Sequence, residues 1–195
     1  STATLVALIT AREKYSNYKI NEQGFSGKEG FRVYCSAEAH SSIEKAVKIA
    51  GFGNNNLVKI DTDKNLAMIP KKLEEAVEQD LANNLFPLCV VAAIGTTGTA
   101  AMDPLLPISE LCLKHNIWLH VDAAYAGTAL VLEEHRHLIK GIENADSFVF
   151  NPHKWMFTNF DCSAYFVKDA DALIRTFEIL PEYLKTKTRG QVNDY

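Results

Sequence analysis

The sequence has no hydrophobic run long enough to cross a lipid bilayer. Its longest apolar stretch, from Phe86 to Ile94, is far shorter than the roughly 20 residues that a membrane-spanning helix needs. No positively charged and then apolar segment of the secretory type opens the chain. We therefore expect no membrane partner and a cytoplasmic location.

The sequence also has no excess of basic residues and few cysteines. Lys and Arg together number 20 against 24 Asp and Glu, which leaves a net charge of -4 and excludes the basic surface that nucleic acid requires. The four cysteines are widely spaced, form no C-x-x-C pair and lie mostly in apolar runs. We expect no nucleic-acid partner, and cysteines that are reduced and buried.

Several common catalytic and binding motifs are absent. The chain contains no G-x-G-x-x-G after a strand, no G-x-x-x-x-G-K-[ST] and no G-x-S-x-G, which removes the simplest nicotinamide, nucleotide and hydrolase interpretations. His135 and His137 suggest a metal ligand pair, but residues two apart do not share a helix face. We therefore expect no metal.

What the sequence does contain is an alternation of strand and helix signals. Its 195 residues are 47% hydrophobic, enough to build a core. Short apolar runs predict strands over 31–36, 57–60, 86–94, 117–122, 147–151 and 163–167. Helical patterns lie over 1–12, 43–50 (capped by Ser41 or Ser42), 71–81 after Pro70, and 105–115. This alternation predicts an α/β fold with a mostly parallel sheet.

The two ends of the sequence indicate a piece of a larger domain. The chain opens directly on a helix with no strand before it, and it closes on polar, loop-like residues 190–195. No internal repeat or linker divides it, so we interpret residues 1–195 as a single piece.

Polar side chains follow several of the predicted strands, where parallel α/β sheets bind their ligands. They are His40, Thr96 and Thr97, Asp122, and the segment Asn151-Pro-His-Lys154. Taken singly, such residues are most often helix caps or surface charges. Together, an acid, an imidazole and a lysine at one sheet edge indicate a site of coupled titratable groups.

Longer motifs around these residues carry a family resemblance. His120-Val-Asp-Ala-Ala-Tyr-Ala-Gly127, Ala145-Asp-Ser-Phe148, Asn151-Pro-His-Lys-Trp155 and Asn159-Phe-Asp-Cys-Ser-Ala164 resemble the group II pyridoxal-5′-phosphate (PLP) dependent decarboxylases. The chain looks most like the aromatic L-amino acid decarboxylases, which act on tyrosine, tryptophan or dopa. The similarity runs over nearly the whole chain in the family's order.

The resemblance implies a fold and a domain assignment. The fold is the large domain of the aspartate aminotransferase-like type (fold type I), with a mixed, mostly parallel sheet flanked by helices. Residues 1–195 then match its central part, without the N-terminal arm, the start of the phosphate loop or the small C-terminal domain. Residues 178–195 match a mobile catalytic loop.

The resemblance also implies the roles of individual residues. Lys154 matches the lysine that carries PLP as a Schiff base, and we expect partial desolvation to ease deprotonation of its amine. Asp122 matches the carboxylate that pairs with the pyridinium nitrogen and keeps the ring an electron sink. The remaining matches to the cofactor pocket are His40 and Ala124 on the two ring faces, Thr97 near the ring substituents, Asn151 and His153 near the phosphate and lysine, and Ser1 at the phosphate loop.

A tyrosine on the predicted loop matches the family's proton donor. Tyr183 lies in the polar, basic segment 181–190, which resembles a lid, and the resemblance implies that it returns a proton to the α-carbon after carbon dioxide leaves. His40, Asp122, Lys154 and Tyr183 are therefore the expected catalytic residues. Because related aldehyde synthases tend to replace the loop tyrosine or the stacking histidine, retention of both favours simple decarboxylation.

The expected reaction is decarboxylation of an aromatic L-amino acid to its amine, with an amino acid as the partner and a homodimer as the assembly. Trp155 and the run 159–164 favour an aromatic substrate over glutamate. Three alternatives stay open: another group II decarboxylase, an aldehyde synthase, and a non-catalytic homologue or inactive fragment. The sequence does not separate tyrosine, tryptophan and dopa.

Overall fold

The computed structural model describes residues 2–179 of the chain as strands, helices and their connections. The strands are β1 (Phe31–Ser36), β2 (Leu57–Ile60), β3 (Phe86–Ala93), β4 (Trp118–Asp122), β5 (Ser147–Phe150) and β6 (Ala164–Val167). The α-helices are α1 (Thr2–Tyr15), α2 (Lys19–Gln23), α3 (Ser42–Ile49), α4 (Pro70–Ala82), α5 (Leu105–His115), α6 (Pro152–Trp155) and α7 (Ala170–Phe177). Short 3-10 turns are η1 (Asn54–Asn56), η2 (Ala126–Val131), η3 (Glu133–Ile139) and η4 (Ile142–Asn144).

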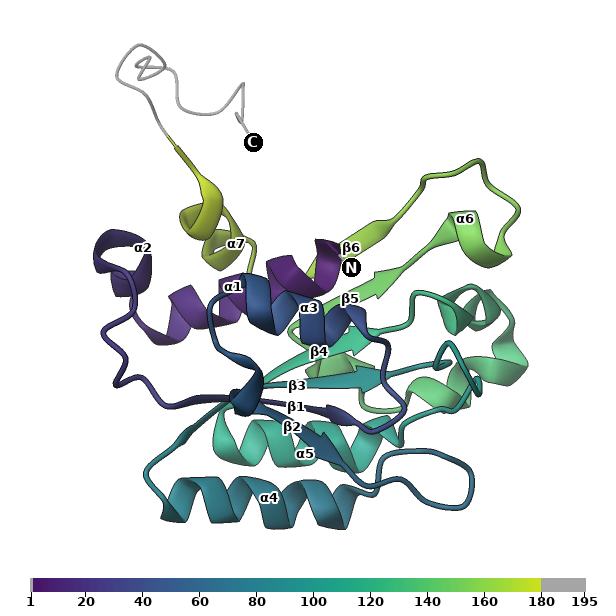
Figure 1. Ribbon diagram of the computed structural model, residues 1–195. Helices are drawn as coiled ribbons and strands as arrows, with labels where there is room; N and C mark the ends of the chain where they lie inside the picture. Colours follow the sequence, from purple (N-terminus) through teal and green to yellow (C-terminus); the bar gives the residue numbers. More distant parts are fainter. Residues whose placement is uncertain (1, 180–195) are drawn as a thin grey trace.

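The strands form a single six-stranded sheet in the order β2-β1-β3-β4-β5-β6. Neighbouring strands from β2 to β5 run parallel, and β6 returns antiparallel to β5. Because the parallel strands point the same way, their carboxyl ends meet at one edge of the sheet, on the side of α6 in Figure 1. The expected α/β class with a mostly parallel, mixed sheet is confirmed.

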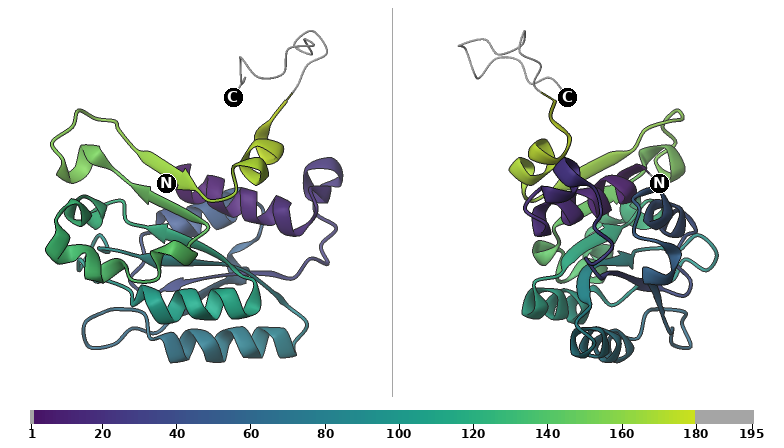
Figure 2. Two further views of the ribbon diagram at one scale, coloured as in Figure 1. Left: turned by 180° about the vertical axis from the view of Figure 1, so that it is seen from behind. Right: turned by 60° about the vertical axis from the view of Figure 1, so that its left-hand side comes forward.

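Helices cover both faces of the sheet, as the continuous apolar strands predict. Figure 1 shows α4 and α5 below the sheet and α1, α3 and α7 above it, and Figure 2 shows the same layers from two other directions. Alternate residues of β3 enter different cores: Val90 packs in the core of the α4 and α5 layer, and Val91 packs in that of the α1 and α3 layer. The sheet is therefore rigidly held between two hydrophobic layers.

The strand predictions agree with the structure to within one residue at each end, and the 105–115 helix agrees at both ends. The sequence pattern did not predict α2, α6 or α7, which are short. Within residues 2–179, no helix combines the length and the apolar content that a membrane crossing needs. Cys35, Cys89, Cys112 and Cys162 are unpaired as expected, but only the first three are buried.

Candidate active site

A cavity of about 400 Å³ opens at the carboxyl edge of the sheet. Loops that follow β1, β3, β4 and β5 form most of its wall, and the first turn of α1 closes one side. The sequence-predicted residues that line it are His40, Thr97, Asp122, Ala124, Asn151, His153 and Lys154. The structure thus brings together every predicted site residue that it describes. Ser1 and Tyr183 lie outside the described residues.

Asp122 is the last residue of β4, and its carboxylate lies at the floor of the cavity. Its Oδ1 accepts a hydrogen bond of 3.1 Å from the backbone N–H of Ala124, which turns the chain sharply after the strand. The carbonyl of Ala124 accepts in turn from the N–H of Asn151 at 3.2 Å. These contacts fix the carboxylate and the small side chain at position 124 relative to β5.

Lys154 lies in α6, a single turn that begins at Pro152. Proline is favoured at this first position because its fixed φ suits a helix and its missing N–H leaves no donor unsatisfied. The N–H of Lys154 donates to the carbonyl of Asn151 at 2.9 Å, which holds the turn against the end of β5. Lys154 is exposed on the outer rim of the cavity, so residues 2–179 do not by themselves supply the expected partial desolvation.

His40 lies between β1 and α3, and its side chain supplies a capping bond to that helix. Its Nδ1 accepts a hydrogen bond of 3.1 Å from the N–H of Ser42. Ser41 occupies the N-cap position, as predicted, but its backbone conformation is helical and its side chain makes no capping bond. The imidazole satisfies the exposed N–H instead, and this contact fixes the ring beside the cavity.

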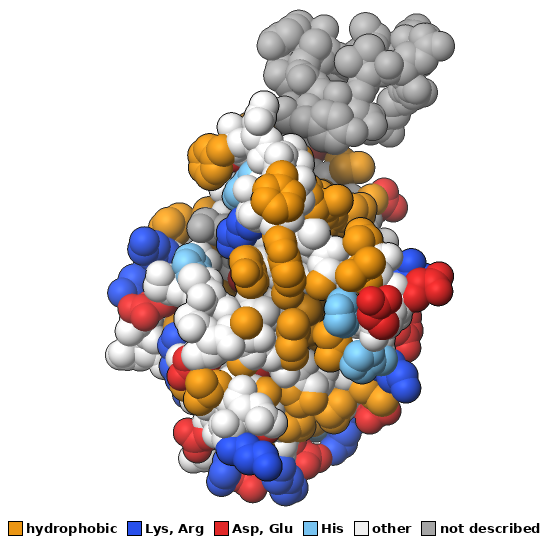
Figure 3. All heavy atoms as spheres, turned by 90° about the vertical axis from the view of Figure 1, so that its right-hand side faces the viewer, with side chains coloured by type: hydrophobic (Ala, Val, Ile, Leu, Met, Phe, Trp, Pro, Cys, Tyr) orange, Lys and Arg blue, Asp and Glu red, His pale blue; other side chains and the backbone are white. Residues whose placement is uncertain are grey.

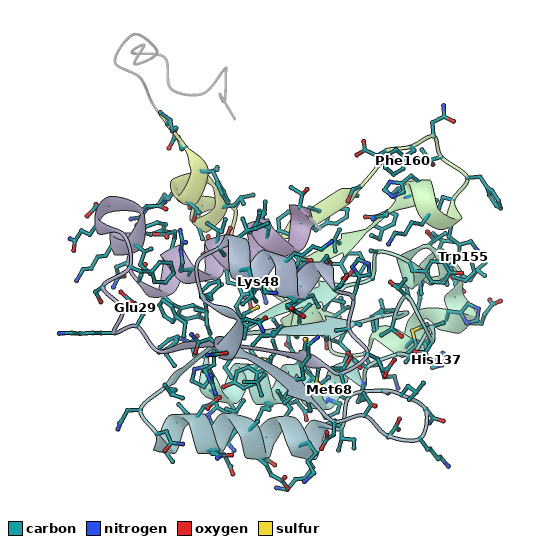
Figure 4. All side chains as sticks on the ribbon, in the orientation of Figure 1. Glu29, Lys48, Met68, His137, Trp155 and Phe160 are labelled. Carbon is teal, nitrogen blue, oxygen red and sulfur yellow. The ribbon has the colours of Figure 1, made fainter. Side chains whose placement is uncertain are left out.

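The loop after α6 folds back over Asn151 and His153. The Ser163 hydroxyl donates to Oδ1 of Asn151 at 2.7 Å, and the N–H of Cys162 donates to Nδ1 of His153 at 2.9 Å. The Phe160 ring lies 4.9 Å from the His153 ring, centroid to centroid. In Figure 4, Phe160 and Trp155 both lie at the α6 side of the molecule, beyond the carboxyl ends of the strands.

The turn after β3 is shaped by a glycine and a threonine. Gly95 has φ +83°, and a Cβ placed there would lie 2.5 Å from Cβ of Ala126, so only glycine fits. The buried Thr96 hydroxyl contacts Oγ1 of Thr99 at 2.6 Å and accepts from the N–H of Ala101 at 2.9 Å. Thr97 is thereby presented to the cavity from a well-fixed turn.

Sequence reasoning missed several residues of the cavity wall. They are Thr2, Ala3, Ser42, Ala93, Gly95, Tyr125, Phe160, Asp161 and Ser163. Phe160, Asp161 and Ser163 belong to the Asn159–Ala164 run. That motif indicates the family, but it does not by itself predict that these residues line the cavity. Thr2 and Ala3 belong to the first turn of α1, whose N–H groups and dipole favour an anion.

The histidine pair at 135 and 137 shows no sign of a metal site. Nδ1 of His137 lies 2.7 Å from the carbonyl of Glu134, within the same turn. No group of three or more His, Cys, Asp or Glu side chains among residues 2–179 is placed to hold a metal ion.

Comparison with known proteins places the chain in a family. The pyridoxal-dependent decarboxylase conserved domain matches residues 1–195. The chain is 42% identical to tyrosine decarboxylase 4 of Petroselinum crispum over 197 residues, covering 99% of this chain and 38% of that protein. It is 44% identical to the aromatic-L-amino-acid decarboxylase of Drosophila lebanonensis over 200 residues, covering 100% of this chain and 49% of that protein.

Solved structures agree with the sequence matches. The crystal structure of Oryza sativa TDC with PLP and tryptamine superposes with a TM-score of 0.88 at 36% identity, covering 94% of this chain and 38% of that one. The chain thus spans less than half the length of the relatives that it matches. The match over the full chain and the shared fold show that it belongs to the pyridoxal-dependent decarboxylase family.

Proposed function

We propose that this chain forms the PLP-binding core of an enzyme that decarboxylates an aromatic L-amino acid to the corresponding amine. The observation that carries the proposal is the meeting of Lys154, Asp122 and His40 around one cavity at the carboxyl edge of the sheet. An amine, a carboxylate and an imidazole in that arrangement provide the groups that a pyridine aldehyde cofactor needs.

The cavity fits PLP in size and in chemistry. Its volume of about 400 Å³ lies in the range that holds small ligands. The first turn of α1, with Thr2 and Ala3 in the wall, offers N–H groups to a phosphate. Asp122 supplies an acceptor for a protonated ring nitrogen, and Ala124 leaves space for a flat ring beside it.

PLP, when bound, supplies the electron sink that accepts the electron pair released as carbon dioxide departs. The residues of the chain hold and tune it. Lys154 would hold the cofactor through its amine, and its place at the exposed rim leaves that amine accessible to a substrate. Asp122 would hold a proton on the ring nitrogen, and His40 would contact one face of the ring.

The other predicted residues orient the cofactor and complete the reaction. Thr97 would contact the ring substituents, Asn151 and His153 would lie near the phosphate and the lysine, and Ser1 would be a further phosphate ligand. Tyr183, in the predicted catalytic loop 178–195, is the proposed proton donor to the α-carbon. Support for these roles comes from the shared cavity and, for Ser1 and Tyr183, from the family resemblance alone.

An aromatic substrate is the proposed class. The named relatives act on tyrosine or on aromatic L-amino acids, and Tyr125 and Phe160 line the cavity of this chain. The exposed ring of Phe160 and the stack of Tyr125 on Trp155, 5.2 Å between centroids, offer aromatic surfaces at the mouth. Another group II substrate, oxidative aldehyde formation and a non-catalytic homologue are the alternatives.

We also propose a homodimer with the site at the subunit interface. Figure 3, which faces the carboxyl ends of the strands, shows hydrophobic side chains gathered across this face. The exposed apolar residues on the segments that surround the cavity are Tyr125, Val131, Leu132, Trp155, Met156, Phe157 and Phe160, here called the rim patch. A patch of this kind is typical of an interface, and a second subunit there covers the exposed Lys154.

The proposal is tested by locating the cofactor on the full-length protein. PLP is added to the wild type and to Lys154→Ala, the absorbance spectra are compared, and borohydride reduction followed by peptide mass mapping locates the adduct. Lys140→Ala is the control, because Lys140 is exposed and absent from the cavity wall. We expect an adduct on Lys154 in the wild type and the control; its absence from the wild type contradicts the decarboxylase assignment.

Product analysis separates decarboxylation from aldehyde formation. We expect the wild type to convert tyrosine, tryptophan or dopa to the amine, and Tyr183→Phe to divert turnover to the aldehyde. Amine and aldehyde are quantified by chromatography. An unchanged amine yield in Tyr183→Phe removes this tyrosine from the mechanism, and aldehyde from the wild type favours the synthase alternative.

A further inference from the structure

A buried histidine, His120, precedes Asp122 by two residues on β4. Successive residues of a strand point to opposite faces, so Trp118, His120 and Asp122 share the face of β4 that α1 covers. His120 is 0% exposed, whereas Asp122 is half-buried in the cavity wall. His120 is therefore the next side chain inward from the carboxylate.

Three side chains form a hydrogen-bonded chain that ends on this imidazole. The indole Nε1 of Trp118 donates to Oγ of Ser147 at 3.0 Å, and the same Oγ lies 2.9 Å from Nδ1 of His120. Ser147 is brought opposite His120 by the parallel register of β4 and β5. All three residues are buried, so the chain is shielded from solvent.

The direction of these hydrogen bonds follows from what each group can donate. An indole N–H only donates, so Ser147 Oγ accepts from Trp118 and keeps its own hydrogen for another partner. A hydrogen bond from this hydroxyl to Nδ1 of His120, 2.9 Å away, puts the proton of a neutral imidazole on Nε2. Nε2 is buried and has no hydrogen-bond partner within residues 2–179.

The imidazole is neutral, and two titratable groups face it. Burial lowers the pKa of His120 to about 4, and the charge of Asp122 opposes this shift only in part. The Tyr165 ring lies 6.2 Å away, and burial raises the pKa of its hydroxyl to about 12, so it too is neutral. Asp122 is thus the anion whose field acts on the His120 ring.

We propose that His120 is a positioning residue for Asp122: the Trp118–Ser147–His120 chain fixes the imidazole with its proton on Nε2, and this N–H dipole stabilises the ionised carboxylate. An ionised Asp122 keeps the ring nitrogen of PLP protonated, so the inference rests on the proposed function. Ser147 enters it as the residue that selects the tautomer. Neither Ser147 nor Trp118 has to contact the cavity for this role.

The first test reads the tautomer without any cofactor. In the full-length apoprotein labelled with ¹⁵N-histidine, the His120 resonances are assigned by their absence from His120→Gln. We expect the Nε2–H form in the wild type and a mixture of both tautomers in Ser147→Ala, whose side chain donates nothing to Nδ1. An Nδ1–H form in the wild type overturns the inference.

The second test measures PLP binding and the protonation of its ring nitrogen, followed with ¹⁵N-labelled cofactor. We expect Ser147→Ala and His120→Asn to weaken PLP binding by about tenfold or more and to lower the pH at which the ring nitrogen loses its proton. His120→Gln, whose longer amide places an N–H near the Nε2 position, should lose less. Thermal melting identifies any variant that does not fold. If a His120 variant does not fold, PLP binding by Ser147→Ala and the tautomer of the wild type decide whether the inference holds.

Ser36→Ala is the matched control, because Ser36 is a buried serine on β1 whose hydroxyl has no partner within the described residues. We expect it to bind PLP as the wild type does. If the wild type and this control bind PLP and both Ser147→Ala and His120→Asn match them, the inference is wrong and the proposed function stands. If the wild type fails to bind PLP, both are wrong.

Discussion

At the scale of single residues, the site depends on one carboxylate with a defined orientation. Asp122 accepts from the N–H of Ala124, and the neutral His120 precedes it by two residues on the same face of β4. Neither group carries a charge that would neutralise the carboxylate. A carboxylate kept in this way is suited to stabilise a positive charge on a bound ligand.

Replacement of Asp122 by asparagine tests that role. Asp122→Asn keeps the size of the side chain and an oxygen for the Ala124 contact, but it removes the negative charge. We expect the rate of decarboxylation to fall by about 10²–10³-fold, the range seen when a preorganised electrostatic contact is lost. Steady-state kinetics on the full-length protein measure the rate. The control is Asp161→Asn, which removes a carboxylate from an exposed loop in the same cavity wall. Equal rates for the wild type and Asp122→Asn contradict the proposed role of Asp122.

His120 also makes a prediction about stability and pH. Its pKa falls from 6.5 to about 4 on folding because of burial, so the unfolded chain binds more protons between these values. The free energy of unfolding should therefore fall as the pH is lowered through this window. The raised pKa values of the buried Asp103 and the half-buried Asp146 act in the opposite direction.

The contribution of His120 is isolated by comparison with a variant that does not titrate there. Denaturant unfolding of the wild type and His120→Gln is measured between pH 7 and pH 4. We expect the difference in unfolding free energy between the two proteins to shrink as the pH falls, because only the wild type carries the buried imidazole. A difference that stays constant across the range shows that His120 is not buried in its neutral form.

At the scale of elements, the turns after the strands decide where the site residues lie. Asp103 holds the turn after β3: its carboxylate accepts from the N–H of Ala93 at 2.7 Å and from that of Met68 at 2.8 Å. Gly95 lets the same turn pass close to Ala126 at the start of η2. The segments after β3 and β4 are thus fixed to one another by backbone contacts rather than by the site residues themselves.

Two glycines of this turn give a matched pair of variants. At Gly95 a Cβ meets Ala126 and the φ of +83° is unfavourable for alanine, whereas a Cβ at Gly98 meets nothing within 4 Å. We expect Gly95→Ala to lower the free energy of unfolding by about 1–3 kcal/mol. Gly98→Ala should leave it unchanged or raise it by up to about 1 kcal/mol. Chemical denaturation measures the free energy of unfolding of both variants. Similar values for the two contradict the close approach of Gly95 to Ala126.

At the scale of the whole molecule, the described residues leave the site open on one side. The cavity has a wall on the sheet side, but Lys154 lies at its exposed rim and the rim patch surrounds its mouth. Phe157 and Phe160 are 97% and 87% exposed, an arrangement that is costly for aromatic side chains in water. The proposed second subunit on this face would cover both the aromatic rings and Lys154.

The dimer prediction is tested at the rim patch. Phe157 does not line the cavity, so Phe157→Ser probes association without changing the site wall. We expect it to raise the dimer dissociation constant by about tenfold or more, as loss of a buried interface aromatic does. Analytical ultracentrifugation measures this, with Ile49→Ser at the C-terminal end of α3, 70% exposed, as the control. If Ile49→Ser weakens the dimer and Phe157→Ser does not, the interface lies elsewhere.

The sequence by itself determined the sheet and the choice of site residues. Strand positions were readable because strands covered on both faces are continuously apolar, and a parallel sheet brings their carboxyl ends to one edge. That rule alone placed His40, Asp122 and Lys154 at the same edge, and the cavity confirms the placement. The roles of these residues stay predictions, as do those of Ser1 and Tyr183.

Only the tertiary structure decided which contacts those residues make. The capping bond of α3 comes from His40 rather than from Ser41 at the N-cap, because the imidazole Nδ1 accepts from the free N–H of Ser42. Ser147 meets His120 through the register of two strands that are distant in the sequence, a pairing that local patterns do not encode. Exposure of Lys154 follows from the position of α6 outside the sheet, and hydrophobic periodicity carries no information about that position.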